Sequence, residues 1–111
     1  MEKDYSPDSS LTDCRTRYPL FFIHGMGFRD NSKWYSYWGR ITDRLKAHGA
    51  SIFFSNHDCI GTIRDNAVKI KERFDELIAT EKIEKVNIIA HSKGGIEARY
   101  LISSLGGAAH T

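Results

Sequence analysis

The sequence predicts an α/β fold in which three parallel strands are flanked by helices. Short apolar runs alternate with longer stretches whose apolar residues recur at helical spacing. This alternation is typical of a parallel sheet joined by right-handed crossovers, with helices on both faces. The 111 residues are enough for one domain. Three strands make a narrow sheet with two unpaired apolar edges, which complete proteins usually avoid, so we expect this architecture to be part of a larger one.

Composition and charge exclude several classes of protein. Hydrophobic residues make up 41% and charged residues 27% of the chain, which is ordinary for a globular protein. The net charge is +2 with basic and acidic residues interleaved, so we expect no nucleic-acid partner, which requires a clustered basic face. The apolar runs are too short for a transmembrane segment, and no signal peptide is visible, which on sequence alone indicates a cytoplasmic protein. Cys14 and Cys59 are interpreted as two reduced thiols in preference to one disulfide.

The first predicted strand follows a polar leader. Residues 1–17 are polar and mixed in charge, so we expect a flexible leader before a domain that spans residues 18–111. Residues 18–24 (YPLFFIH) form a continuous apolar run that ends at Gly25. This is the pattern of a strand buried on both faces.

A helix and a second strand come next. After a loop at residues 25–33, the apolar residues between 34 and 48 recur at helical spacing, and Gly49 provides a C-terminal stop. The members of that apolar stripe are Trp34, Trp38, Ile41 and Leu45. Residues 50–55 (ASIFFS) then predict a second short strand, followed by a loop at residues 56–61.

Two further helices enclose the third strand. Residues 62–80 carry one apolar stripe and an opposite charged face, so we expect an amphipathic helix with a solvated outer surface. Residues 86–90 (VNIIA) predict the third strand, and a last helix is expected from Gly95 to Ser104.

The most informative motif lies between the third strand and the last helix. The segment AHSKG (residues 90–94) places a serine on a sharp strand-to-helix turn, an arrangement in which the serine projects as a nucleophile. We therefore predict Ser92 as a catalytic nucleophile. The N-terminus of the following helix carries partial positive charge, and the backbone N–H of Lys93 is the predicted oxyanion donor.

Small residues around this serine fit the predicted turn. The helix passes close to the strand that it has just left, so the residues two before and two after the serine must be small. Ala90 and Gly94 satisfy this requirement, and Gly95 is expected to add clearance.

A second oxyanion donor should come from the loop after an earlier strand. Residues 24–27 (HGMG) follow the first apolar run, with Met26 as the predicted donor and Gly25 and Gly27 allowing a substrate carbonyl to approach the backbone. We interpret His24 as a residue that holds this loop in place. His91 adjoins the serine but is a poor general base, because neighbours on a sharp turn point their side chains apart.

Three segments resemble the bacterial triacylglycerol lipases of the α/β-hydrolase superfamily. They are YPLFFIHGMGFRD, VNIIAHSKGG and IEARYLISSLG, which run from about Tyr18 to Gly107. The resemblance implies the N-terminal half of an α/β-hydrolase fold, with a nucleophile elbow at Ser92 and an oxyanion hole formed by the amides of Met26 and Lys93. It implies hydrolysis of carboxylic esters, acylglycerols in particular, through an acyl-Ser92 intermediate and without a cofactor.

The sequence also departs from that family. Ala90 stands where glycine is commoner, and Arg99-Tyr100 match a pair that we interpret as structural. In the family a later half of the chain supplies the catalytic acid, the catalytic histidine, the lid and any calcium site. We therefore expect impaired activity in the isolated chain, with a complementing C-terminal chain as the source of the absent groups. Bacterial lipases of this kind are often secreted, whereas the lack of a visible signal peptide indicates a cytoplasmic protein.

Several alternatives stay open at this point. Phe28, Trp34 and Tyr35 could line an acyl pocket, although packing under the loop is favoured for Trp34 and Trp38. His57-Asp58-Cys59 lacks a second pair of ligands, so no metal site is predicted. The chain could instead be a non-catalytic remnant or interaction module whose sheet edges take up a strand from another chain. A third alternative keeps the fold but transfers the acyl group to an alcohol.

Overall fold

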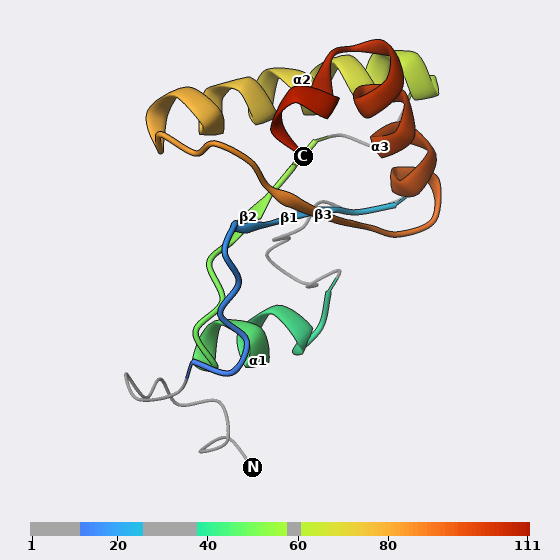
Figure 1. Cartoon of the computed structure of the whole chain (residues 1–111). Coiled ribbons are helices and arrows are strands. Elements are labelled where there is room, and N and C mark those ends of the chain that lie inside the picture. Colours follow the sequence, from blue (N-terminus) through green and yellow to red (C-terminus); the bar gives the residue numbers. More distant parts are fainter. Residues whose placement is uncertain (1–11, 26–37, 58–60) are drawn as a thin grey trace.

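Three parallel strands form one sheet in the computed structural model, which describes residues 12–25, 38–57 and 61–111. The strands are β1 (Leu20–Ile23), β2 (Ile52–Phe54) and β3 (Asn87–Ala90). Their order in the sheet is β2-β1-β3, so the first strand in the sequence is central in space (Figure 1). Both pairings are parallel, which confirms the predicted open sheet.

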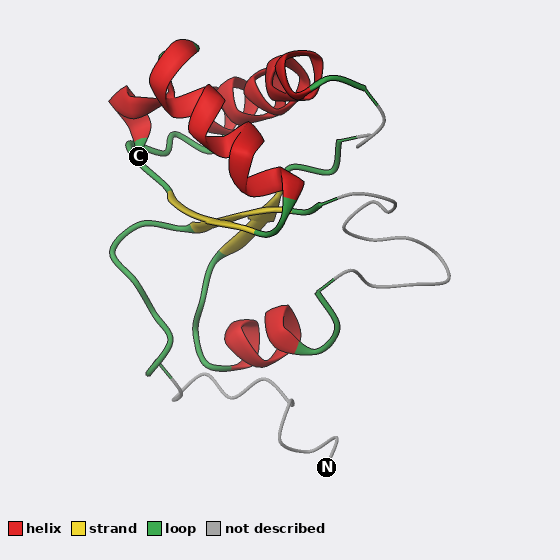
Figure 2. Cartoon of the chain, turned by 90° about the vertical axis from the view of Figure 1, so that its right-hand side faces the viewer, coloured by secondary structure: helices red, strands yellow, loops and turns green. Residues whose placement is uncertain are grey.

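Helices cover both faces of the sheet, as predicted. α1 (Ile41–Ala47) lies on one face, and α2 (Ile63–Thr80) and α3 (Lys93–Ser104) lie together on the other (Figure 2). A short 3-10 helix, η2 (Gly107–His110), follows α3 and packs against it. The α/β class and the flanking helices are therefore confirmed.

The central strand is buried on both faces because its side chains alternate between two cores. Phe21 and Ile23 face α2 and α3, and Leu20 and Phe22 face α1. The other buried members of the first core are Ile70, Phe74, Leu77, Val86, Ala98 and Leu101. On the opposite face, the ring of Phe22 meets that of Trp38 edge-on at 4.8 Å between centroids. A continuous apolar run thus becomes a strand with two covered faces.

Two helix boundaries differ from the prediction. The helix expected over residues 34–48 is described only from Trp38, where a turn leads into α1 at Ile41; residues 34–37 lie outside the described residues. α3 begins at Lys93 rather than at Gly95. The earlier start arises because the turn at Ser92 is complete within one residue, so that the Gly95 N–H already donates to the Ser92 carbonyl at 2.9 Å.

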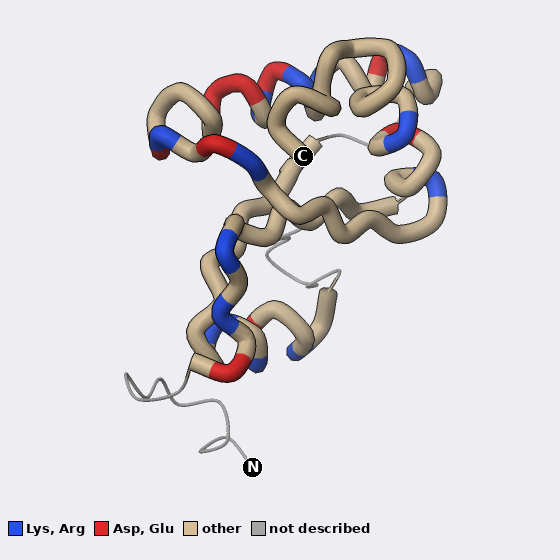
Figure 3. The backbone as a smooth tube through the Cα atoms, in the orientation of Figure 1, with Lys and Arg blue, Asp and Glu red and all other residues tan. Residues whose placement is uncertain are grey.

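α2 has the predicted amphipathic character. It begins after Thr62, whose Oγ1 accepts a hydrogen bond from the Asp65 N–H at 3.0 Å, a favourable N-terminal cap. Its outer face carries both signs of charge, including an ion pair of 3.0 Å between Arg73 and Glu76, and Figure 3 shows basic and acidic positions interspersed along it. Among the helices that the structure describes, none is both long and apolar enough to cross a membrane.

Residues 12–17 of the expected leader lie against the end of α1. The backbone N–H of Cys14 donates to the carbonyl of His48 at 2.9 Å. The Asp13 carboxylate accepts a hydrogen bond of 2.7 Å from the His48 ring, which lowers the pKa of Asp13. Cys14 is a free thiol, whereas residues 1–11 and Cys59 lie outside the described residues.

Candidate functional site

The strand order creates a switch point beside the central strand. The connection from β1 through α1 leads to β2 on one side of the sheet, and the connection from β2 through α2 leads to β3 on the other side. In open α/β sheets, ligands bind where the carboxyl ends of two strands send their chains in opposite directions. Here those ends are followed by His24 and Gly25 after β1, and by His91 and Ser92 after β3.

Ser92 forms the sharp turn between β3 and α3. Its backbone has φ 59° and ψ −130°, a conformation that non-glycine residues rarely adopt. The residue is exposed to solvent. The turn is held from both sides: the His91 N–H donates to the Ile23 carbonyl at 3.1 Å, and the Gly94 N–H donates to the His91 carbonyl at 3.0 Å. The structure therefore places an exposed serine in a strained turn at the N-terminus of a helix of 12 residues.

Gly94 is required where α3 crosses the end of β1. A Cβ atom on Gly94 would collide with the carbonyl oxygen of His24 and would lie 2.9 Å from that of Ile23. These are backbone atoms, which cannot move aside as the end of a flexible side chain can. At Gly95, by contrast, a Cβ would meet nothing within 4 Å. The clearance expected of Gly95 is therefore not needed, because that residue faces open space.

The strain at Ser92 leads to a prediction about stability. We expect a Ser92→Gly chain to be more stable than a Ser92→Ala chain by about 1 kcal/mol, because glycine adopts a positive φ without the steric cost that a Cβ brings. Both variants lack the hydroxyl, so the comparison isolates the backbone. Urea denaturation monitored by circular dichroism gives the two free energies of unfolding, and equal values would show that the turn is unstrained.

His24 is fully buried directly after β1. Its two ring nitrogens each lie 2.8 Å from a carbonyl oxygen: Nδ1 from that of Gly25 and Nε2 from that of His57. A neutral imidazole donates to one of these carbonyls at a time, whereas the protonated ring donates to both. These contacts connect the start of the loop after β1 to the loop after β2. The His24 ring therefore has the hydrogen-bond partners that its predicted role, holding the loop in place, requires. The other residues predicted for this region, which are Met26, Gly27, Phe28, Trp34 and Tyr35, lie outside the described residues.

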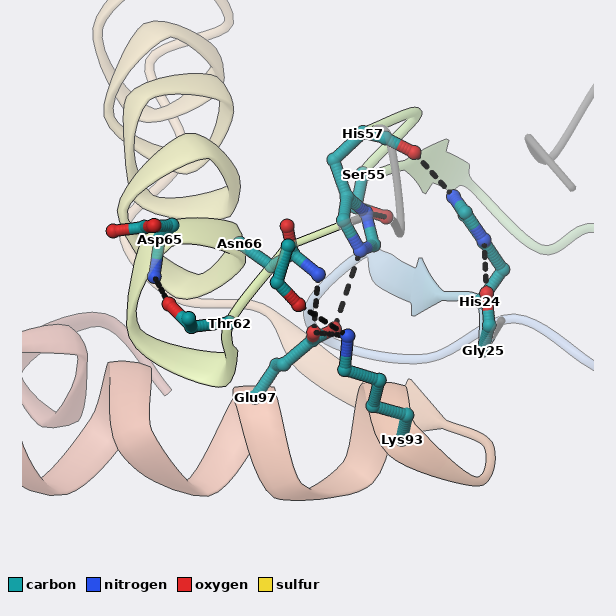
Figure 4. Close-up of polar contacts among 10 residues, drawn as sticks. His24, Gly25, Ser55, His57, Thr62, Asp65, Asn66, Lys93 and Glu97 are labelled. Atoms are coloured by element: carbon teal, nitrogen blue, oxygen red, sulfur yellow. Dashed lines mark hydrogen bonds and ion pairs between the residues drawn. The ribbon is translucent and has the colours of Figure 1, made fainter. Parts of the chain in front are cut away.

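A buried polar network that the sequence did not predict centres on Glu97. This side chain of α3 is fully buried and accepts hydrogen bonds from Asn66 Nδ2 at 2.7 Å and from His57 Nε2 at 3.3 Å (Figure 4). The ammonium group of Lys93 lies 3.6 Å from the same carboxylate and donates to the carbonyl of Gly61 at 2.7 Å. Three separate segments therefore meet at one carboxylate: α3, the start of α2 and the loop after β2.

One signal in the sequence could have indicated this network. Glu97 lies three residues after Gly94 and four before Leu101, which places it on the buried face of α3. An acidic residue on an apolar stripe requires polar partners. His57 entered the sequence analysis only through the weak metal pattern His57-Asp58-Cys59. Within the described part of the chain no three His, Cys, Asp or Glu side chains gather as metal ligands would, and Asp58 and Cys59 lie outside it.

Ser55, His57 and Glu97 form a serine–histidine–acid series of hydrogen bonds, but with the two ring nitrogens exchanged relative to a catalytic triad and without the exposure of one. When His57 donates from Nε2 to Glu97, its Nδ1 accepts from the Ser55 hydroxyl, which lies 2.9 Å away. Only 2% of the Ser55 surface is exposed, so a substrate has no access comparable to that at Ser92. The Ser55 hydroxyl acts here as a hydrogen-bond partner that fixes the His57 ring.

Comparisons with known proteins give matches to one kind of enzyme. The chain is 30% identical over 96 residues to the triacylglycerol lipase of Pseudarthrobacter phenanthrenivorans, an alignment that covers 81% of this chain and 30% of that lipase. The triacylglycerol lipase of Burkholderia plantarii matches equally well, with 26% of its length covered. That of Vibrio cholerae is 28% identical over 89 residues, with 28% of its length covered. No family model matches the chain.

The class of protein follows from the fold and the turn together. A parallel sheet covered on both faces, with a strained serine between a strand and a helix, is the arrangement of the α/β-hydrolases. The curated matches are more specific: over 81% of its length the chain is similar to triacylglycerol lipases. It spans less than a third of the length of the relatives that it matches.

Proposed function

We propose that this chain carries the nucleophile and the oxyanion-binding elements of an ester hydrolase that acts on carboxylic esters of the acylglycerol class. The observation that supports the proposal most strongly is the exposed Ser92 at a strained turn, with φ 59° and ψ −130°, beside the switch point of the sheet. The matched relatives are named triacylglycerol lipases, and this supports the choice of ester class.

The proposed reaction proceeds by acyl transfer through Ser92. The serine Oγ bonds to the ester carbonyl carbon as its proton passes to a base, and the carbonyl π electrons move to oxygen. The amides of Lys93 and Met26 are the proposed donors to this oxyanion, aided by the N-terminus of α3. When the tetrahedral intermediate collapses, the C–O bond to the alcohol breaks and the alcohol leaves with a proton. Water then adds to the acyl-serine and releases the carboxylic acid.

The base for this reaction is proposed to come from outside these 111 residues. Among the described histidines, His24 and His57 are buried and their rings are engaged in hydrogen bonds. The ring of His91 lies edge-on to that of Trp38. A serine without a base remains protonated and weakly nucleophilic. We therefore propose that this chain alone is impaired, and that its full activity requires a histidine and an acid from a complementing polypeptide segment.

Covalent labelling tests the proposed nucleophile. A fluorophosphonate reacts when the serine oxygen bonds to phosphorus and fluoride leaves, and the serine proton passes to solvent. We expect slow labelling of the folded chain, with peptide mapping by mass spectrometry locating the phosphonyl group on Ser92, together with weak hydrolysis of p-nitrophenyl butyrate. Labelling spread over other serines, or none from a folded sample, would contradict the proposal and favour a non-catalytic interaction module.

The alternative module has one structural observation in its favour. β3 is an edge strand of the described sheet, and its residue Ile89 is 37% exposed. An edge of this kind can accept a strand from another chain. Under this alternative the chain would bind a partner but would not react with the phosphonate.

A further inference from the structure

Glu97 is the carboxylate at which polar groups from three segments meet, in addition to the apolar core that α2 and α3 share. A buried carboxylate is costly unless it is paired and hydrogen-bonded. Glu97 meets this condition through three groups from different places: Asn66 of α2, His57 of the loop after β2, and Lys93 one turn earlier on α3. Because every partner is polar and the Glu97 carboxylate is fully buried, the positions of these segments relative to one another are closely constrained.

The network reaches Lys93 on one side and His24, at the end of β1, on the other. On one side it contacts Lys93, the residue that supplies the proposed amide donor after Ser92. On the other side, the His57 carbonyl accepts from His24 Nε2 at 2.8 Å, and the two imidazole rings stack with their centroids 4.3 Å apart. His24 lies two residues before Met26, the proposed second donor. A continuous series of contacts therefore connects α3 to the loop after β1 (Figure 4).

The orientation of Asn66 also depends on Glu97. Asn66 is fully buried, its Nδ2 donates to Glu97, and its Oδ1 has no hydrogen-bond partner in the described part of the chain. Rotating the amide by 180° would place an oxygen against the carboxylate, so the observed orientation is the one that Glu97 selects. A buried acceptor without a partner is unfavourable, so the hydrogen bond to Glu97 is the interaction that keeps the Asn66 amide in this orientation.

We propose that Glu97 is a positioning residue for the oxyanion hole, acting through Lys93 on one side and through His57 and His24 on the other. The inference rests on the proposed function, because it assumes that the amides of Lys93 and Met26 receive the oxyanion. In this proposal His57 is the residue that fixes the position of His24 relative to Glu97 and α3. A misplacement of about 1 Å in such a site can cost about a hundredfold in rate.

The kinetics of phosphonate labelling test this role. Glu97→Gln removes the charge but keeps the size of the side chain, and Glu97→Asp keeps the charge but moves it back by one methylene. We expect Glu97→Gln to lower the maximal labelling rate constant of Ser92 by about tenfold to a hundredfold, and Glu97→Asp to recover part of it. The final labelled fraction and the half-saturating probe concentration should stay unchanged. The matched control is Glu81→Gln, at an exposed acid just after α2, which should label like the parent chain.

Rate and extent of labelling separate positioning from folding. A merely structural role would lower the final labelled fraction, because fewer molecules fold, while the folded ones react at the parent rate; that result would overturn the proposal. An unchanged rate in Glu97→Gln would overturn it as well. If Glu97→Gln does not fold, Glu97→Asp decides: a lower rate supports the proposal and the parent rate contradicts it.

A spectroscopic measurement makes the outcome independent of labelling. In ¹⁵N–¹H correlation spectra, the amide signals of both Lys93 and Gly25 should shift in the Glu97 variants and stay in place in Glu81→Gln. A shift confined to Lys93 would show that the two donors are not coupled and would overturn the inference. If the parent chain is not labelled at Ser92, the proposed function fails, while these spectra still decide whether Glu97 connects the two segments.

Discussion

Replacing Ser92 by alanine is expected to abolish phosphonate labelling and the weak hydrolysis of p-nitrophenyl butyrate. Ser92 is the exposed serine of the strained turn, and in the proposed mechanism its Oγ forms the only covalent bond to substrate. Loss of the nucleophile in a complete serine hydrolase costs about 10⁶ in turnover. Because we propose that another polypeptide segment supplies the base, we expect a low starting activity, and the loss should appear as a signal that falls to the background rate.

Ser103→Ala provides the control on the same helix. Ser103 lies on the exposed surface of α3 and its hydroxyl donates to the Arg99 carbonyl at 2.7 Å. Its removal should leave the labelling rate at Ser92 unchanged. If Ser92→Ala retains labelling in a folded sample, the nucleophile is a different residue and the proposed mechanism is wrong.

Replacing Gly94 by alanine is expected to produce the largest loss of stability among single substitutions at the turn. The added methyl group would be driven into the carbonyls of His24 and Ile23, so either α3 moves away from the sheet or the end of β1 moves. Forcing extra volume into a packed site costs about 1–3 kcal/mol, and we expect a value near 3 kcal/mol because backbone atoms are the obstacle. The free energy of unfolding in urea measures the effect.

Gly95→Ala is the matched comparison one residue further along α3. Its Cβ would enter open space, and alanine is favoured over glycine inside a helix by about 0.5–1 kcal/mol. We therefore expect this variant to be slightly more stable than the parent chain. Opposite signs for two adjacent glycines would confirm the close approach at Gly94, whereas equal effects would show that α3 does not lie against β1 as described.

Local patterns in the sequence were sufficient for the elements and for the turn. The run LFFI of β1 predicts a buried strand because each of its side chains is apolar, and the structure covers both faces of this strand. The turn at Ser92 was predictable because its requirements are local: a preceding apolar strand, a small residue at position 94 and a following helix. α3 begins two residues earlier than the sequence predicts, because the turn at Ser92 is complete within one residue and Lys93 and Gly94 already belong to the helix.

The network around Glu97 could not be predicted in the same way. His57 and Glu97 are separated by 40 residues, and Asn66 and Glu97 by 31 residues, so no local spacing connects them. The strand order brings them together, and the order depends on which strand pairs with β1. Two-sided burial of β1 is visible in its sequence, but the identities of its neighbours are not.

The central place of β1 in the sheet has a consequence for the order of folding. Leu20 pairs with Ile52 in β2 and with Asn87 in β3, so the second pairing closes a chain segment roughly twice as long as the first. Parallel pairings between distant segments form slowly, and β1 with β2 can come together before β3 has joined. The turn that presents Ser92 exists only when β3 has docked and α3 lies across the end of β1. The turn at Ser92 is therefore expected to form only after β1 and β2 have paired.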